Sequence, residues 1–499
     1  MIHSVPNLSV PMEAVAHAAE DPDRIDAYVW RVSGVVLLGS VMSILDTTIV
    51  NVALATLSRD LHATISSIQW VVTGYLLALA AVIPITGWAG RRFGTKQVYL
   101  VSLVLFTAGS ALCGLATSTT ELIIFRVLQG AGGGMIMPLG QQMMAEAAGP
   151  KRMGRVMGML GVPVMLAPIL GPTIGGLIVQ NASWRWIFYV NVPIGALAVI
   201  AAVRVLPRPD PQPADRLDVR GLALMATGLP LITYGLAEIG ATGSFGFTKV
   251  ILPIVLGLGL TAAFAVHALH VERPLLDLRL LRRPAFSSAS VAMFSLGAAL
   301  FGAMVLLPLY WQEVRHQSVV HAGLLMAPQG IGAAAVMPLA GRLADRIGGG
   351  PPALFGSIVT VVASIPFGLI GAHTSIVWLS AVMVARGIGI GFAFMPVFSA
   401  AFATLERKEL SDATPQLNVF MRLGGSFGTA ILAVVLQRAL AGTDTAAEAA
   451  SAYGTAFWAS TIIAAIAIVP CIVLMRAERA ARRSARAAPS QEPALEAAA

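Results

Sequence analysis

The segment FRVLQGAGGGMIMP (Phe125–Pro138) places one arginine and a row of glycines inside a long apolar stretch. A second segment of the same character, ARGIGIGFAFMP (Ala385–Pro396), lies in the other half of the chain, and its arginine follows the first by 260 residues. In both segments glycines follow the arginine and Met-Pro closes the run. Self-similarity of this kind indicates that a structural unit has been duplicated.

Two further pairs of segments repeat in the same order. GWAGRRFGTK (Gly87–Lys96) corresponds to GRLADRIGGG (Gly341–Gly350), at an offset of 254 residues. LGPTIGG (Leu170–Gly176) corresponds to RLGGSFG (Arg422–Gly428). Three landmarks at a nearly constant spacing predict two related halves.

The composition is that of a membrane protein. Hydrophobic residues make up 57% of the 499 residues, charged residues only 12%, and the mean hydropathy is +0.78. A soluble domain carries about 25% charged residues. A helix needs about 20 apolar residues to cross the hydrocarbon core. Such runs lie near 32–54, 68–90, 98–117, 122–146, 156–180, 186–206, 217–238, 250–270, 287–312, 321–343, 351–371, 375–404, 411–440 and 457–476. We therefore expect an all-α polytopic membrane protein with fourteen transmembrane helices.

The distribution of Lys and Arg predicts the orientation. If the N-terminus is cytoplasmic and the spans alternate, three arginines fall inside spans and most other basic residues fall in inner segments. The outer segments then hold only Arg59, Arg185, Lys249, Arg315 and Arg438. By the positive-inside rule both termini are cytoplasmic. The net charge of +8 is then a topology signal, and no nucleic-acid partner is expected.

The spans group into two six-helix halves. We expect a cytoplasmic N-terminal tail, the first half, two inserted spans with an interfacial linker, the second half and a cytoplasmic tail, over residues 1–31, 32–206, 207–286, 287–476 and 477–499. Parallel six-span halves around a midplane site are typical of alternating-access transporters. Cys113 and Cys471 both lie in apolar stretches, which argues against a disulfide framework or a metal site.

Several segments together resemble a known family. The strongest are LDTTIVNVAL (Leu45–Leu54), WRWIFYVNVPIG (Trp184–Gly195), LLPLYWQ (Leu306–Gln312) and APILGPTIGG (Ala167–Gly176). With the repeated motifs they resemble the major facilitator superfamily, and within it the fourteen-span drug:proton antiporters of the EmrB/QacA type, over about residues 32–476. The resemblance implies the major facilitator fold with two extra central helices. It also implies proton-coupled export of amphiphilic or cationic drugs and toxic compounds across a bacterial inner membrane.

Asp46 is the sharpest candidate for proton coupling. It lies 14 residues into the first predicted span, and at 1.5 Å per residue this is about 21 Å from the inner boundary, well within the hydrocarbon core. A charged side chain at this depth costs at least a few kcal/mol, so we expect it to face the protein interior or a water-filled cavity. The alternative is an Asp that only caps or pairs with a neighbouring helix.

Arg126 enters the membrane from the other side, about 7 residues into the fourth span. Counting from the outer boundary places it about 10 Å deep, the same depth as Asp46 within error. A direct or water-bridged contact between the two is therefore a hypothesis. The family resemblance implies a role in proton coupling for Arg126, and a purely structural ion pair between two helices stays open.

The resemblance also assigns two kinds of motif. The antiporter motif, which in the family prevents proton leak and favours export, comprises Pro168, Gly171, Pro172, Gly175 and Gly176. A cytoplasmic gate is expected from the loop motifs after spans 2 and 10, at Gly87, Arg91, Arg92, Gly94, Gly341, Asp345, Arg346 and Gly348. Arg91 stands where the family has an acidic residue, whereas Asp345 keeps it. Ordinary inner-loop charge is the alternative reading of these residues.

Trp70, Tyr75, Gln312, Arg386 and Arg422 are candidates for the transport pathway. The two arginines lie near the midplane, where a buried network in the second half is an alternative to substrate contact. Gly130–Gly134 follow no strand and lie in an apolar run, so they predict close helix packing and not a dinucleotide site. No GxxxxGK[ST] motif occurs, so we expect no cofactor, no catalytic or metal-binding residues, and transport driven by the proton gradient.

Alternative functions are export of a specific endogenous metabolite or lipid on the same fold, and a transport-dead sensor. The expected partners are protons, amphiphilic small molecules and the lipid bilayer. In a cell with two membranes, a periplasmic adaptor and an outer-membrane channel would be additional partners. No enzymatic activity is expected.

Overall fold

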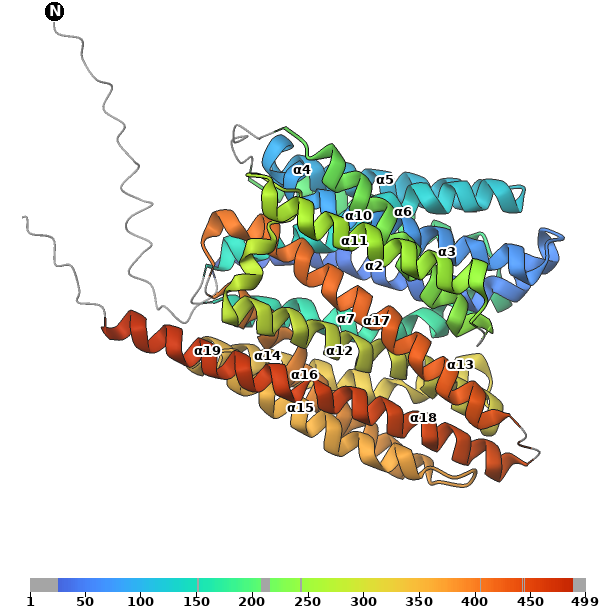
Figure 1. Ribbon diagram of the computed structural model, residues 1–499. Helices are drawn as coiled ribbons and strands as arrows, with labels where there is room; N and C mark the ends of the chain where they lie inside the picture. Colours follow the sequence, from blue (N-terminus) through green and yellow to red (C-terminus); the bar gives the residue numbers. More distant parts are fainter. Residues whose placement is uncertain are drawn as a thin grey trace, which may run out of the picture.

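The computed structural model describes residues 26–149, 152–207, 216–242, 245–403, 405–441, 443 and 445–487. Figure 1 shows a bundle of long helices that run between two ends. The described residues form helices and short connections without a strand. Because every backbone polar group of a helix except those at its termini is satisfied internally, such a bundle suits a bilayer.

The first half consists of six spans. Their helices are α2 (Ala27–Asp60), α3 (Ile65–Val82) continued by η2 (Ile83–Ile85) and α4 (Thr86–Phe93), α5 (Thr95–Leu115), α6 (Thr119–Ala148), α7 (Met153–Asn181), and α8 (Trp186–Tyr189) with α9 (Asn191–Val205). Two further spans follow, α10 (Val219–Thr242) and η3 (Phe247–Ile251) with α11 (Leu252–His270).

The second half repeats the pattern. Its helices are α12 (Pro284–Leu309) with η5 (Tyr310–Val314), α13 (Val319–Leu325) with α14 (Ala327–Ile347), α15 (Gly350–Ser364) with η6 (Ile365–Leu369), α16 (Ile376–Phe402), α17 (Leu410–Leu440), and α18 (Ala446–Ile466) with α19 (Ile468–Ala487). Among the described residues, 13 helices are long and apolar enough to span a membrane, or 14 if the bent pair Met153–Ala167 and Leu170–Asn181 is one span. The prediction of fourteen spans is confirmed on that count.

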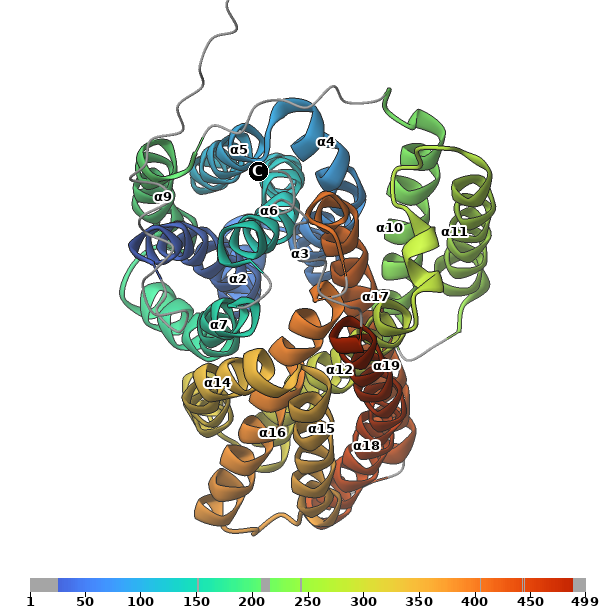
Figure 2. The same cartoon turned by 90° about the vertical axis from the view of Figure 1, so that its left-hand side faces the viewer.

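The two inserted spans lie beside the halves rather than between them. Figure 2 shows α10 and α11 at one flank, and α10 contacts both α3 and α17 whereas α11 packs mainly on α10. The most apolar window of the span Phe247–His270 is only 22% buried inside the protein, against 72% for Pro284–Val314. The inserted pair therefore covers one side of the seam between the halves.

The structure adds detail at the ends of two elements. The interfacial linker after α11 contains a short, five-residue 3-10 helix, η4 (Leu278–Arg282). The helix α19 runs to Ala487, well into the expected C-terminal tail. Its Glu478 is 3% exposed and accepts hydrogen bonds from the backbone N–H groups of Gly349 and Gly350 at 3.0 and 2.8 Å. A carboxylate at the N-terminus of α15 is favourable, and this contact explains why α19 continues past Glu478.

Both ends of the described chain lie at the same end of the bundle, where α2 begins and α19 ends (Figure 1). We call this the terminal end. Two loop glycines there have positive φ, 86° at Gly94 after α4 and 100° at Gly348 after α14. L-residues with a side chain rarely adopt this conformation. The duplicated loop motif thus fixes the same sharp connection in each half.

Candidate functional site

Asp46 lies at the centre of a buried polar cluster in the first half. Its side chain is 0% exposed. Its Oδ2 accepts a hydrogen bond from Arg126 Nη1 at 2.5 Å, and its Oδ1 accepts from Gln129 Nε2 at 2.9 Å and from Asn191 Nδ2 at 3.0 Å. Asp46 therefore faces the protein interior, and in this conformation its charge is fully satisfied by protein groups. The predicted contact with Arg126 is confirmed.

The guanidinium of Arg126 is held by three helices. Besides Asp46 on α2, it donates to Gln129 Oε1 at 2.9 Å within α6 and to the carbonyl oxygen of Val71 on α3 at 3.1 Å. Its Cζ lies 4.1 Å from the centre of the Tyr75 ring, a cation–π contact. The pair joins helices of one half only, so it does not lock the two halves together.

Sequence reasoning missed the neutral members of this cluster, Gln129, Asn191 and Ser110. Asn191 also donates to Ser110 Oγ at 3.1 Å, and Ser110 Oγ donates to the Phe188 carbonyl at 2.9 Å. Gln129 and Asn191 both stand inside quoted motifs, so a polar side chain in an otherwise apolar span was the available signal. Charge-assisted hydrogen bonds of this kind orient the carboxylate.

Arg386 occupies the related position in the second half and is also buried, at 2% exposed. It donates to Gln329 Oε1 at 2.5 Å, to Ser364 Oγ at 3.1 Å and, from a longer distance of 3.4 Å, to the carbonyl of Ala299. All of these acceptors are neutral. Beside it is a cavity of about 10 Å³, room for about one water molecule.

The duplication explains the difference between the clusters. At the 254-residue offset of the loop motifs, Ser110 corresponds to Ser364 and Asp46 corresponds to Leu300, which lines the cavity beside Arg386. The arginine and serine positions are thus shared by the two halves, but the carboxylate is present in the first half alone.

Arg422 lies near the middle of α17 and faces the first half. One helical turn before it, Asn418 Nδ2 donates to Gln141 Oε1 of α6 at 2.6 Å. Because residues four apart share a face of a helix, Arg422 is turned to the same side. Tyr75 is an electrostatic neighbour of Arg422, and the buried Nε of Arg422 has no hydrogen-bond partner among the described residues. Arg422 thus lies at the seam near Tyr75, partly exposed.

The antiporter motif on α7 packs against the helix that carries Asp46. A Cβ at Gly171 would collide with Thr48, and one at Gly175 would lie 2.8 Å from Ile49 Cγ1. Gly176 faces Val320 of α13, in the other half. Pro172 is partly buried, and the side chain of Pro168 is outside the described part of the structure. The motif therefore allows close contact of α7 with α2 and with the second half.

At the terminal end, Asp345 of α14 joins the two halves. Its Oδ1 accepts from the Gly154 N–H at 2.6 Å, and its Oδ2 accepts from Arg155 N–H at 3.2 Å and Arg155 Nε at 3.0 Å. These groups form the first turn of α7, so the carboxylate also meets the positive end of that helix. Gly341 packs against the carbonyl of Gly154, which brings the two backbones together.

Arg91 of the first half forms the related contact with the second half, but here the loop residue is the base and its partner on the other half is the acid. It lies 254 residues before Asp345 and donates to Asp412 Oδ1 at 2.6 Å and to Ser411 Oγ at 2.8 Å in the first turn of α17. Gly87 packs on the Ser411 carbonyl. The missing acid is thus replaced by a base that meets an acid on the partner helix. Arg92 and Arg346 are exposed.

Two pathway candidates lie away from this region. Trp70 is 42% exposed and stacks on Tyr234 of α10, with ring centres 5.7 Å apart. Gln312 donates to the Pro308 carbonyl of its own helical segment at 3.2 Å, near the opposite end of the bundle. Of the five candidates, the structure brings Tyr75 and Arg422 close to the Asp46 cluster and places Arg386 in the separate second-half cluster.

Comparison with known proteins gives consistent relatives. The family model described as Major Facilitator Superfamily matches residues 36–429. The "Multidrug resistance protein B homolog" of Mycobacterium tuberculosis is 40% identical over 418 residues, which cover 83% of this chain and 77% of the relative. The "Multidrug export protein EmrB" of Haemophilus influenzae is 31% identical over 402 residues, 79% of this chain and 78% of the relative.

Solved structures share the fold at low identity. The human organic anion transporter MFSD10 aligns over 89% of this chain and 99% of its own, with a TM-score of 0.60 and 15% identity. The proton:xylose symporter XylE aligns over 87% and 95%, with a TM-score of 0.59 and 14% identity. At this identity the likeness concerns the fold alone.

Proposed function

Because the chain belongs to the major facilitator superfamily, we propose that it is a proton-coupled antiporter that exports amphiphilic drugs and toxic compounds by alternating access. Relatives named for multidrug resistance and multidrug export support a drug exporter. The observation that carries proton coupling is Asp46, a fully buried carboxylate whose partners all belong to one half.

Asp46 is suited to exchange a proton because its protonation state changes how well the buried cluster is satisfied. Ionised, it accepts hydrogen bonds from Arg126, Gln129 and Asn191. Protonated, it becomes neutral and Arg126 loses its counter-charge. The proton enters when the pathway opens outward and leaves when it opens to the cytoplasm. Each opening has to rearrange the cluster, because Asp46 is closed off from water in the present conformation.

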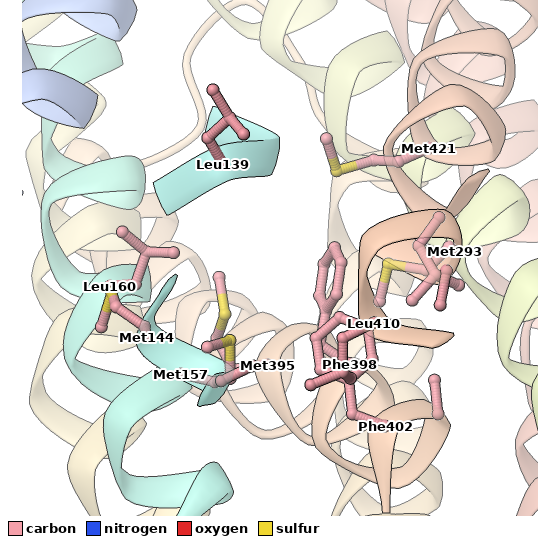
Figure 3. Packing of buried hydrophobic residues seen from close by; sticks show 14 of the residues in the cluster. Leu139, Met144, Met157, Leu160, Met293, Met395, Phe398, Phe402, Leu410 and Met421 are labelled. Carbon is pink, nitrogen blue, oxygen red and sulfur yellow. The ribbon is translucent and has the colours of Figure 1, made fainter. Parts of the chain in front are cut away.

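The contacts at the terminal end hold that end closed. Asp345 and Arg91 each bridge from one half to the first turn of a helix in the other. Behind them lies a methionine-rich seam, defined by Met144 of α6, Met157 of α7 and Met395 of α16, which lie close together in Figure 3. Methionine side chains repack readily, so this seam suits a surface that closes and opens in each cycle.

The placement in the membrane follows from charge. The basic excess at the terminal end supports a cytoplasmic location of that end, with both termini, by the positive-inside rule. The closed conformation is then closed to the cytoplasm. We place the protein in the inner membrane of a bacterium, where an inward proton gradient drives export.

A second candidate is an exporter of one endogenous metabolite or lipid. The observation that favours it is the polar face of α17, where Asn418 and Arg422 point to the seam. A compound selected by several polar contacts would suit such a face better than a set of unrelated lipophilic cations.

The test is proton-driven efflux from vesicles. Inverted vesicles with the wild-type protein should take up a fluorescent amphiphile when a pH gradient, acidic inside, is imposed. Asp46→Asn should abolish the gradient-driven part. The matched control Asp60→Asn, at the exposed end of the same helix, should keep it. Gradient-driven transport by Asp46→Asn at the wild-type rate would remove Asp46 from the mechanism.

Misfolding has to be separated from uncoupling. Breaking a buried ion pair by removing one partner costs roughly 3–5 kcal/mol, because the other charge is left unpaired. The double variant Asp46→Asn/Arg126→Gln removes both charges. If it folds and still binds the amphiphile but does not respond to the gradient, the loss in the single variant is one of coupling.

A further inference from the structure

The charges within the membrane depth do not balance. The described spans carry three arginines near mid-depth, Arg126, Arg386 and Arg422, but Asp46 is the one carboxylate that pairs with any of them. Arg386 compensates with three neutral acceptors in a closed pocket. Arg422 has neither arrangement.

Arg422 differs from the other two arginines in having no polar partner among the described residues. It forms no hydrogen bond or ion pair with any described residue, and its Nε is buried without a partner. A guanidinium at this depth costs a few kcal/mol unless it is paired or reached by water. Because it is partly exposed at the seam, a group that enters between the halves can reach it.

The surroundings of Arg422 indicate what kind of group that is. Its electrostatic neighbour Tyr75 is uncharged and itself stacks on the Arg126 guanidinium. Asp46 is occupied by its own partners. A cation here would meet two arginines, whereas an anion would meet a planar fork of donors. Next in the chain, Met421 belongs to the apolar core at the seam (Figure 3).

We propose that Arg422 binds the acidic group of the exported compound, so that the substrates of this protein are amphiphiles with a carboxylate or similar anion and an apolar body. Arginine pairs with a carboxylate through two parallel hydrogen bonds. The inference rests on the proposed export function, but it does not use the Asp46 carboxylate, so acid recognition and proton coupling can be tested separately. Export of an anion is also favoured by a membrane potential that is negative inside.

The test uses three fluorescent probes with one apolar body: pyrenebutanoate, pyrenebutanamide and pyrenebutylamine, which are anionic, neutral and cationic. Binding to the purified protein is measured by fluorescence for the wild type, Arg422→Gln, Arg422→Lys and a control, Arg438→Gln, at an exposed position of the same helix. A hydrogen bond to a charged group predicts that the wild type binds the anion about ten-fold or more tightly than the amide.

Arg422→Gln should remove that preference while binding of the amide stays within about two-fold, which also shows that the variant is folded. Arg422→Lys should keep part of it, because lysine keeps the charge but not the planar fork. Arg438→Gln should bind all three probes as the wild type does.

The proposal is overturned if the wild type binds the amine most tightly, or if Arg422→Gln keeps the ratio of anion to amide. These outcomes concern the wild type and one folded variant, so a variant that does not fold still leaves the wild-type comparison decisive. Failure of the proposed function looks different: the probes bind with the expected order but no vesicle moves them in response to a proton gradient.

Discussion

Reversing the charge of either Arg91 or Asp412 should favour opening of the terminal end, and reversing both should restore its closure. The two side chains are 28% and 20% exposed and their ion pair measures 2.6 Å. An exposed ion pair contributes 1 kcal/mol or less, and a hydrogen bond between charged groups about 1.5–3 kcal/mol. Arg91→Asp removes this contact and sets two carboxylates against each other. After discounting for solvent, we expect the closed conformation to lose about 1–2 kcal/mol, so the open population rises about 5–30-fold.

The assay is the rate at which a maleimide labels a cysteine in the methionine-rich seam. Met157→Cys is suitable because Met157 is 0% exposed in the closed conformation. The native Cys113 and Cys471 are also buried and would be replaced by serine. If opening is fast compared with labelling, the labelling rate follows the open population. Arg91→Asp and Asp412→Arg should each raise the rate about 5–30-fold, and the double variant should return it to within about three-fold of the parent.

Two controls separate this contact from general charge effects. Arg92→Asp changes the charge of the neighbouring exposed residue and should leave the rate nearly unchanged. Exchanging Asp345 and Arg155 should not restore closure, because Asp345 also accepts two backbone N–H groups at the start of α7. An arginine there would face the positive helix end. A double variant of Arg91 and Asp412 that labels as fast as the single variants would refute the reasoning.

Three other results follow from the cluster and the loops. Asn191→Leu removes a hydrogen-bond donor to Asp46. It should lower gradient-driven transport, measured in vesicles, and should lower the free energy of unfolding by about 1–3 kcal/mol, measured by thermal unfolding. Glu478→Ala frees two amides at the start of α15 and should make the end of α19 sensitive to protease in an otherwise folded protein; equal digestion of both proteins would contradict this. Asp218 has a lowered pKa, since hydrogen bonds from Gly221 N–H, His267 and Leu275 N–H outweigh its partial burial. Its contribution to stability is therefore present above an unfolded pKa of about 3.9 and is lost as the pH falls further. Below about pH 4 the melting temperature of Asp218→Asn should therefore fall less steeply with pH than that of the wild type.

The spans and the main ion pair were predictable because both depend on one-dimensional quantities. Apolar run length gives the spans, and a rise of 1.5 Å per residue gives the shared depth of Asp46 and Arg126. The neutral partners Gln129 and Asn191 depend instead on how each helix is rotated about its axis. In a helix that is apolar on all sides, hydrophobic periodicity does not reveal that rotation.

The charge-exchanged contact of Arg91 was not predictable for a different reason. Asp412 lies 321 residues further along the chain, and a motif read locally shows only that an expected acid is absent. The continuation of α19 to Ala487 was not predictable either, because Glu478 looks like a solvated charge in sequence. Its docking on α15 depends on backbone amides exposed by a turn in another helix.

The two halves share a framework but differ in the charges it carries. In each half a buried arginine on the fourth span donates to the first and second spans of that half. A serine lies at the matching position of the third span, but only Ser364 accepts a hydrogen bond from its arginine. In the first half the position of Asp46 supplies an acid, and in the second half the matching Leu300 does not. A duplicated unit that bound protons in both copies would need two such acids. With one acid and the unpaired Arg422, our two proposals assign proton exchange to the first half and recognition of the exported compound to the second half.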